Sequence, residues 1–148
     1  MNNKVLKDAR QIADRLLALR NDAQRDILMR FFKTGAGEYG EGDKFLGIKV
    51  PVTRSVVRMV DKNLPLSETE RLLLSPWHEV RLCALLILVE QFGRIANRRD
   101  QEAMEQRDAM VSFYLRHADQ VNNWDLVDAS APKIIGRWLL CPTALGQQ

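Results

Sequence analysis

The middle of the chain holds one long apolar run, Leu82-Cys83-Ala84-Leu85-Leu86-Ile87-Leu88-Val89. The run belongs to a longer helical pattern, from about Pro76 to Phe92. Within the run, this helix is apolar almost all the way around. A helix of this kind is stable when neighbouring elements cover it on every side. The run therefore predicts a buried central helix, with Ser75 as its N-cap and Gly93 as its end.

Amphipathic helices are predicted on both sides of this central helix, because apolar residues recur there at steps of three and four. The predicted inner faces before it are Val5, Ile12, Leu16 and Leu19, then Ile27, Leu28, Phe31 and Phe32, then Val52, Val56, Met59 and Val60. A capping box at Ser67 to Glu70 predicts one more helix before it, and two helices follow it, at about 101–117 and from Trp124 to Pro132.

No segment alternates apolar and polar residues for long enough to predict a strand. The fold is therefore predicted to be all-α. Helices of this length, joined by short links, suit either a compact bundle or a solenoid of helix pairs, and periodicity does not separate the two.

The size and composition favour one ordinary domain. The chain has 148 residues, and its 2 cysteines and 2 histidines do not form a zinc-finger framework or a disulfide scaffold. No signal segment opens the chain, and the longest apolar run is shorter than the ~18 residues that a membrane span needs. These features predict a soluble, cytoplasmic protein with no membrane partner.

Positive charge is concentrated in the first half, where residues 1–62 carry 13 Lys and Arg against 8 Asp and Glu. Cations that follow one helix can track the phosphates of a nucleic acid. The alternative is an ordinary solvated helix face. Five glycines between Gly35 and Gly47 would let the backbone approach a phosphate, although the P-loop pattern of nucleotide sites is absent. The basic stripe comprises Lys44, Lys49, Arg54, Arg58 and Lys62.

The strongest candidate for chemistry is the segment Asn122-Asn123-Trp124-Asp125-Leu126-Val127-Asp128. Once it is helical, the indole of Trp124 and the carboxylate of Asp128 share one face, because they are four residues apart. A carboxylate beside an aromatic ring suits a cation, since the ring face is negative. The alternative is structural, because Asn123 is a good N-cap and Trp is common in protein cores.

Other catalytic patterns are not found. The sequence has no HExxH and no GxSxG, and no Cys and His pair has a convincing third member. His78 is predicted to be a structural residue at the start of a helix, and Cys83 an inert part of the core.

Three blocks, in this order, resemble the AlkD-type DNA alkylation repair family: Tyr39 to Pro51, His78 to Leu82, and Asn122 to Asp128 followed by Pro132 to Gly136. The similarity runs from about Val5 to Leu140. The resemblance implies a right-handed solenoid of HEAT-like antiparallel helix pairs, whose concave, basic face holds duplex DNA. It also implies hydrolysis of the N-glycosidic bond of N3- or N7-alkylated purines, with no metal and no cofactor.

Carried onto this sequence, the family's Trp-x-x-x-Asp pair falls on Trp124 and Asp128, the expected catalytic residues. Asp128 would stabilise the oxocarbenium-like sugar and position the attacking water, and Trp124 would pack its ring against the deoxyribose. The expected partner is duplex DNA with alkylated bases. The basic stripe, Lys44, Lys49, Arg54, Arg58 and Lys62, is the expected DNA-binding surface.

The family's second half, which supplies a phosphate-binding arginine and a further tryptophan, has no counterpart before Gln148. The sequence therefore predicts a truncated or frameshifted product, with a helical-repeat domain at 1–140 and a non-matching, disordered tail at 141–148. Self-association through the open solenoid end is expected. Two other functions stay open: a catalytically inactive module that binds DNA, and a HEAT-like protein-interaction scaffold.

Overall fold

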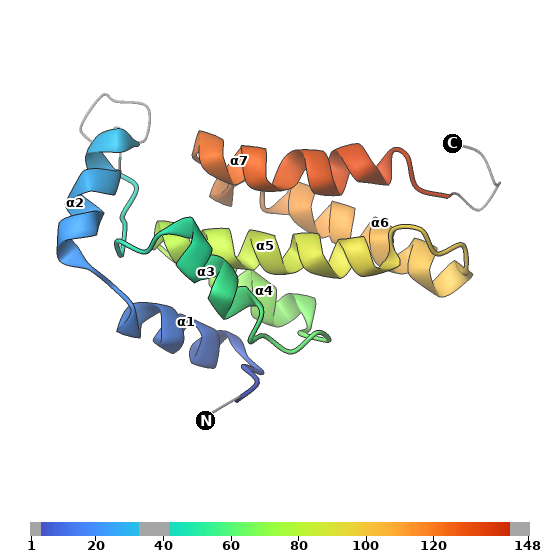
Figure 1. Ribbon diagram of the computed structural model, residues 1–148. Coiled ribbons are helices and arrows are strands. Elements are labelled where there is room, and N and C mark those ends of the chain that lie inside the picture. Colours follow the sequence, from blue (N-terminus) through green and yellow to red (C-terminus); the bar gives the residue numbers. More distant parts are fainter. Residues whose placement is uncertain (1–3, 33–41, 143–148) are drawn as a thin grey trace.

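The computed structural model describes residues 4–32 and 42–142, and this part of the chain is helical, with no strand longer than an isolated bridge. Its α-helices are α1 (Ala9–Ala18), α2 (Asp22–Phe31), α3 (Val50–Val57), α4 (Leu66–Leu73), α5 (His78–Ile95), α6 (Gln101–Arg116) and α7 (Trp124–Ala131) (Figure 1). A 3-10 helix at Ala118–Gln120 precedes α7, and a π-helical turn at Pro132–Gly136 continues it. The predicted all-α fold is confirmed. Gly35, Gly37, Gly40 and the block from Tyr39 to Glu41 lie outside the described residues.

Helix α5 is buried, as its apolar sequence predicts. Every residue from His78 to Leu88 is buried. Helices α1, α3, α4, α6 and α7 all pack against α5, which runs through the centre of Figure 1. Burying one Leu side chain stabilises a fold by about 1.5–3 kcal/mol. Helix α5 is therefore the core that positions the other helices.

The start of α5 differs from the prediction. The helix begins at His78, and Ser75 is not its N-cap. Trp77 is extended and forms an isolated parallel bridge with Lys44, whose carbonyl accepts the N–H of His78 at 2.7 Å. The Ser75 hydroxyl accepts the N–H of Trp77 at 3.1 Å instead. The pairing of Trp77 with Lys44, more than 30 residues away, therefore keeps the backbone extended up to Trp77, and the helix begins after it.

The end of α5 also differs. The helix continues past Gly93 and ends at Ile95. The buried guanidinium of Arg107, on α6, donates to the carbonyls of Ile95 and Arg98. A cation at a helix C-terminus satisfies free carbonyls and interacts favourably with the helix dipole. Arg107 therefore takes the capping role that the sequence assigned to Gly93.

The first and fourth helices begin at other residues than the sequence predicts. Helix α1 begins at Ala9, so Val5 precedes it and is exposed. Helix α4 begins at Leu66, and Ser67 makes no cap bond. The Glu68 carboxylate accepts the N–H of Ala9 at 2.9 Å, which links α4 to α1.

Helix α2 lies at the edge of the fold (Figure 1) and has no buried residue. Ile27 and Phe31, predicted on its inner face, are exposed, and Phe32 at its C-cap is buried. Asn21, the N-cap of α2, lies against Gly47, which has φ +89°. A Cβ on Gly47 would lie 1.9 Å from the Asn21 carbonyl oxygen. Only glycine allows this approach.

The structure describes two residues of the segment predicted as a tail, Cys141 and Pro142. Cys141 is buried, and the Pro142 carbonyl accepts a hydrogen bond from Arg107. No helix within 4–32 or 42–142 combines the length and the hydropathy needed to cross a lipid bilayer.

Candidate functional site

Trp124 and Asp128 occupy the first two turns of α7. Asn123 is the N-cap, as predicted, and its side-chain oxygen accepts the N–H of Trp124 at 3.0 Å. Trp124 is the first residue of the helix and is 41 % exposed, so it is not a core residue. Asp128, one turn later, is exposed, and within the described residues its carboxylate makes no hydrogen bond or ion pair. The pair therefore lies on the surface with a free carboxylate.

Two phenylalanines from the end of α2 lie beside Trp124. Its ring centroid is 6.1 Å from that of Phe31 and 5.4 Å from that of Phe32. Phe31 is 62 % exposed, whereas Phe32 is buried. The structure thus adds an exposed aromatic side chain next to Trp124 that the sequence did not predict.

Three cations of the basic stripe lie at α3. Lys49 is the N-cap of α3, Arg54 lies within it and Arg58 is its C-cap. All five cations of the stripe are exposed, and none forms an ion pair with a described carboxylate. One nearby acid, Asp43, is buried and does not offset the stripe, because its charge is paired internally. The positive charge of the stripe is therefore available to solvent.

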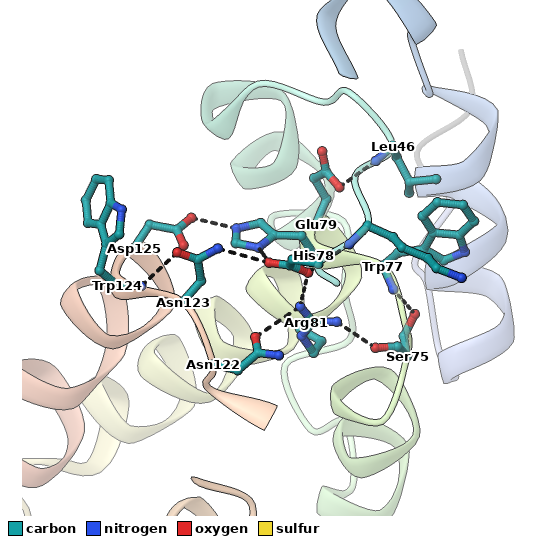
Figure 2. A network of polar contacts seen from close by, with 12 residues as sticks. Leu46, Ser75, Trp77, His78, Glu79, Arg81, Asn122, Asn123, Trp124 and Asp125 are labelled. Carbon is teal, nitrogen blue, oxygen red and sulfur yellow. Dashed lines mark hydrogen bonds and ion pairs between the residues drawn. The ribbon is translucent and has the colours of Figure 1, made fainter. Parts of the chain in front are cut away.

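A buried polar network, which the sequence analysis did not predict, joins α5 to α7 (Figure 2). The His78 ring lies between two carboxylates, with Nδ1 at 2.7 Å from Asp43 Oδ2 and Nε2 at 2.6 Å from Asp125 Oδ2. Asn123 donates from Nδ2 to Asp43 Oδ2 at 3.1 Å. This network ties the loop before α3 to the first turn of α7.

Arg81 completes the network from the next turn of α5. Its Nη2 donates to Asp43 Oδ1 and, at 3.2 Å, to Asn122 Oδ1, and its Nη1 donates to the Ser75 carbonyl at 2.9 Å. With its ring protonated, His78 together with Arg81 balances the two carboxylates, Asp43 and Asp125. A balanced and hydrogen-bonded set of charges is the form in which such groups tolerate burial.

The network changes the ionisation of its members. Burial alone raises the pKa of Asp43, but His78, Asn123 and Arg81 outweigh it and lower the pKa from 3.8 to about 2. Burial alone lowers the pKa of His78, but hydrogen bonds and charge from Asp125 and Asp43 raise it above 6.5. An ionised Asp43 carboxylate and a protonated His78 ring are therefore favoured together.

Glu79, next to His78, holds the loop that leads into the basic stripe. Its carboxylate accepts three backbone N–H groups, from Leu46 at 2.8 Å, Gly47 at 2.9 Å and Ile48 at 3.1 Å. All four residues are buried. The resemblance block His78 to Leu82 thus contains the side chains that position the segment before α3.

One feature of the sequence indicates a buried polar network. His78, Glu79 and Arg81 stand at the start of a helix that is otherwise apolar and buried, and buried polar groups need partners. The partners of His78 lie 35 residues away at Asp43 and 47 residues away at Asp125. No local pattern identifies them.

In the part of the chain that the structure describes, neither Cys83 nor a group of metal-ligand side chains forms a second site. Burial raises the pKa of the Cys83 thiol to about 12, which keeps it protonated, in agreement with the predicted inert role. Within the described ranges, no three His, Cys, Asp or Glu side chains are grouped in a way that suits a metal ion.

Comparison with known families identifies the chain. A family model described as DNA alkylation repair enzyme matches residues 12–145, a span that contains the basic stripe, the buried network and the Trp124 and Asp128 pair. Neither the curated proteins nor the solved structures searched gave a match. Since the family model covers most of the chain and agrees with the sequence resemblance, this protein belongs to the AlkD-type DNA alkylation repair family.

Proposed function

We propose that the protein is a DNA glycosylase, which binds duplex DNA and hydrolyses the N-glycosidic bond of N3- or N7-alkylated purines. The observation that carries this proposal is the exposed pair on α7, in which the indole of Trp124 and the free carboxylate of Asp128 stand one helical turn apart. Family membership supplies the repair context.

The chemistry needs little more than electrostatic stabilisation. An alkylated purine is cationic and leaves as a neutral base with the electrons of the broken bond. The deoxyribose then develops positive charge at C1′, and a water molecule adds there and loses a proton. A carboxylate ~4 Å from this charge, at an effective dielectric near 20, contributes about 4 kcal/mol, or about a thousandfold in rate. Asp128 supplies that charge and orients the water, and Trp124 packs its negative ring face against the sugar.

Binding to DNA is assigned to the basic stripe. Its cations are exposed and unpaired among the described residues, and three of them follow α3 at steps of four or five residues. Each phosphate that such a cation neutralises releases counterions, so binding weakens as salt is added. Helices α3 and α7 both pack on α5, which keeps the stripe and the Trp124 and Asp128 pair on one rigid support.

The test is release of alkylated purine from a methylated duplex under single-turnover conditions. The native chain should release base, and Asp128→Asn should reduce the rate about a thousandfold. Asp119→Asn, an exposed acid outside the pair, is the matched control and should retain the native rate. Equal, background-level release by all three proteins would exclude the glycosylase.

The other two functions considered above are distinguished by binding. If no base is released but an undamaged duplex is bound at low salt, the protein is an inactive DNA-binding module. If the duplex is not bound at any salt concentration, only the protein-interaction scaffold remains.

A further inference from the structure

The two contacts of the His78 ring require two protons. Both ring nitrogens lie within 2.7 Å of a carboxylate oxygen, one from Asp43 and one from Asp125. A neutral imidazole has a single N–H, so it can donate to one of two ionised carboxylates and would turn a lone pair toward the other. Only the doubly protonated ring satisfies this geometry with both acids ionised.

The groups around the ring come from the loop before α3, from α7, from its own helix α5 and from the end of α2. Asp43 approaches from the loop before α3, and Asp125 approaches from α7. Arg81, on α5 with His78, reaches the ring through Asp43, whereas Glu79 is turned to the loop backbone. From the end of α2, the ring that meets His78 is the uncharged Phe32. Loss of the imidazole proton would therefore leave this buried set with one net negative charge.

The two carboxylates do not depend on His78 equally. Asp43 also accepts hydrogen bonds from Arg81, Asn123 and the N–H of Lys44. Asp125 has no such support: its Oδ1 is buried and has no partner among the described residues, and its Oδ2 contacts His78. When the ring becomes neutral, it can keep its bond to Asp43, and the contact that is lost is the one to α7.

We propose that His78 is a positioning residue, whose doubly protonated ring holds Asp125 and thereby fixes the first turn of α7, with Trp124 and Asp128, in its working orientation. This inference rests on the glycosylase function proposed above. Asp125 follows Trp124 directly and lies three residues before Asp128, so a shift of Asp125 moves both ends of the pair. A misplacement of about 1 Å can reduce an enzymatic rate about a hundredfold.

A row of aromatic rings also connects His78 to Trp124. Phe45 stacks on the His78 ring, with centroids 4.2 Å apart, and Phe32 stacks on Phe45 at 5.2 Å. Phe32 in turn contacts the Trp124 ring at 5.4 Å. The position of the indole is thus coupled to His78 through packing as well as through the backbone of α7.

The consequence is a loss of activity at alkaline pH. We call the His78 ring with its bonds to Asp43 and Asp125 the clamp. Because the two carboxylates raise the pKa of His78 above 6.5, the clamp is formed below that raised value and opens as the pH rises through it. On the acid side Asp43 remains ionised down to about pH 2, so its arm of the clamp persists at mildly acidic pH.

The first measurement is the protonation state of the ring, read from its ¹⁵N chemical shifts. His117→Asn, which removes the other histidine of the chain, assigns the signals. Both nitrogens of His78 should be protonated at pH 6, and the titration midpoint should lie above 6.5. A midpoint at or below 6.5 would overturn the proposal. This measurement does not depend on base release, so it decides the clamp even if the glycosylase proposal fails.

The second measurement is the pH profile of single-turnover base release by Asp125→Asn, an isosteric change near the surface that avoids emptying the core. The variant should lose about tenfold or more in rate at pH 7, and the midpoint of its alkaline limb should fall by about 1–3 pH units, because one carboxylate no longer favours the protonated ring. Affinity for the duplex should be unchanged. Asp119→Asn is the control and should keep both the native rate and the native midpoint. A native rate and native alkaline limb in Asp125→Asn, with His78 protonated, would overturn the positioning role.

Discussion

At the scale of single residues, Glu79 is the side chain whose removal should be most costly for the fold around the site. Its carboxylate satisfies three buried N–H groups. In Glu79→Gln one oxygen becomes an NH₂ group that faces donors, and each N–H left without an acceptor costs about 1–3 kcal/mol. We expect the free energy of unfolding to fall by about 3 kcal/mol in urea denaturation. Glu90→Gln, an exposed change on the same helix, is the control, and an equal effect of both substitutions would refute this role.

The cap at Asn123 was predictable from the sequence, whereas the contacts of His78 were not. The N-cap role of Asn123 is local, and it was predicted correctly from residue type and position. The contacts of His78 depend on carboxylates 35 and 47 residues away, and no periodicity encodes such pairs. Local spacing therefore predicted Trp124 and Asp128 as candidates, but it did not predict the contacts of His78.

At the scale of elements, the helices were predictable and several of their ends were not. Apolar spacing, together with the capping signals at Ser67 and Asn123, located approximately the α-helices found within 4–32 and 42–142, because these signals are local to each segment. The start of α5 is set by the bridge between Trp77 and Lys44, and its end by Arg107. These are tertiary contacts, which override the local signals of Ser75 and Gly93.

The DNA-binding role proposed for the cations at α3 predicts how binding depends on salt. If Arg54 and Arg58 each contact one phosphate, the double variant Arg54→Gln/Arg58→Gln should bind duplex DNA more weakly and reduce the log–log salt slope by about 1.8, which is 0.9 for each phosphate contact. Titrations at several salt concentrations measure this slope. Arg71→Gln/Arg116→Gln removes the same charge from α4 and α6 and should leave the slope unchanged. An equal loss in both double variants would mean that binding follows net charge alone.

At the scale of the whole molecule, the buried network predicts how stability depends on pH. The pKa of Asp43 is lowered to about 2, so its contribution is present above 3.8 and is lost as the pH falls toward 2; the shift corresponds to about 2 kcal/mol. The pKa of His78 is raised, so its contribution is present below 6.5 and is lost as the pH rises through the raised value. Urea denaturation across pH should therefore show a stability maximum between these limits. Asp43→Asn should flatten the acid side of that profile, and an unchanged acid side would contradict the assignment.

Self-association, expected from the sequence, remains a prediction at this scale. Leu139 and Leu140, after the π-helical turn, are 64 % and 76 % exposed. Adjacent exposed apolar side chains favour association between copies. Sedimentation should show a mass that rises with concentration, and Leu139→Glu/Leu140→Glu should abolish the rise. A native chain that stays monomeric at every concentration would refute it.

The central claim is that Trp124 and Asp128 recognise a deoxyribose that carries positive charge. Its most direct test is binding to two duplexes, one with a cationic nitrogen analogue of the sugar and one with a neutral ring of the same shape, since groups that stabilise a transition state bind its mimic more tightly. We predict that the native chain binds the cationic duplex about a hundredfold or more tightly than the neutral duplex, and that Asp128→Asn loses this preference. Equal affinity of the native chain for the two duplexes would contradict the claim.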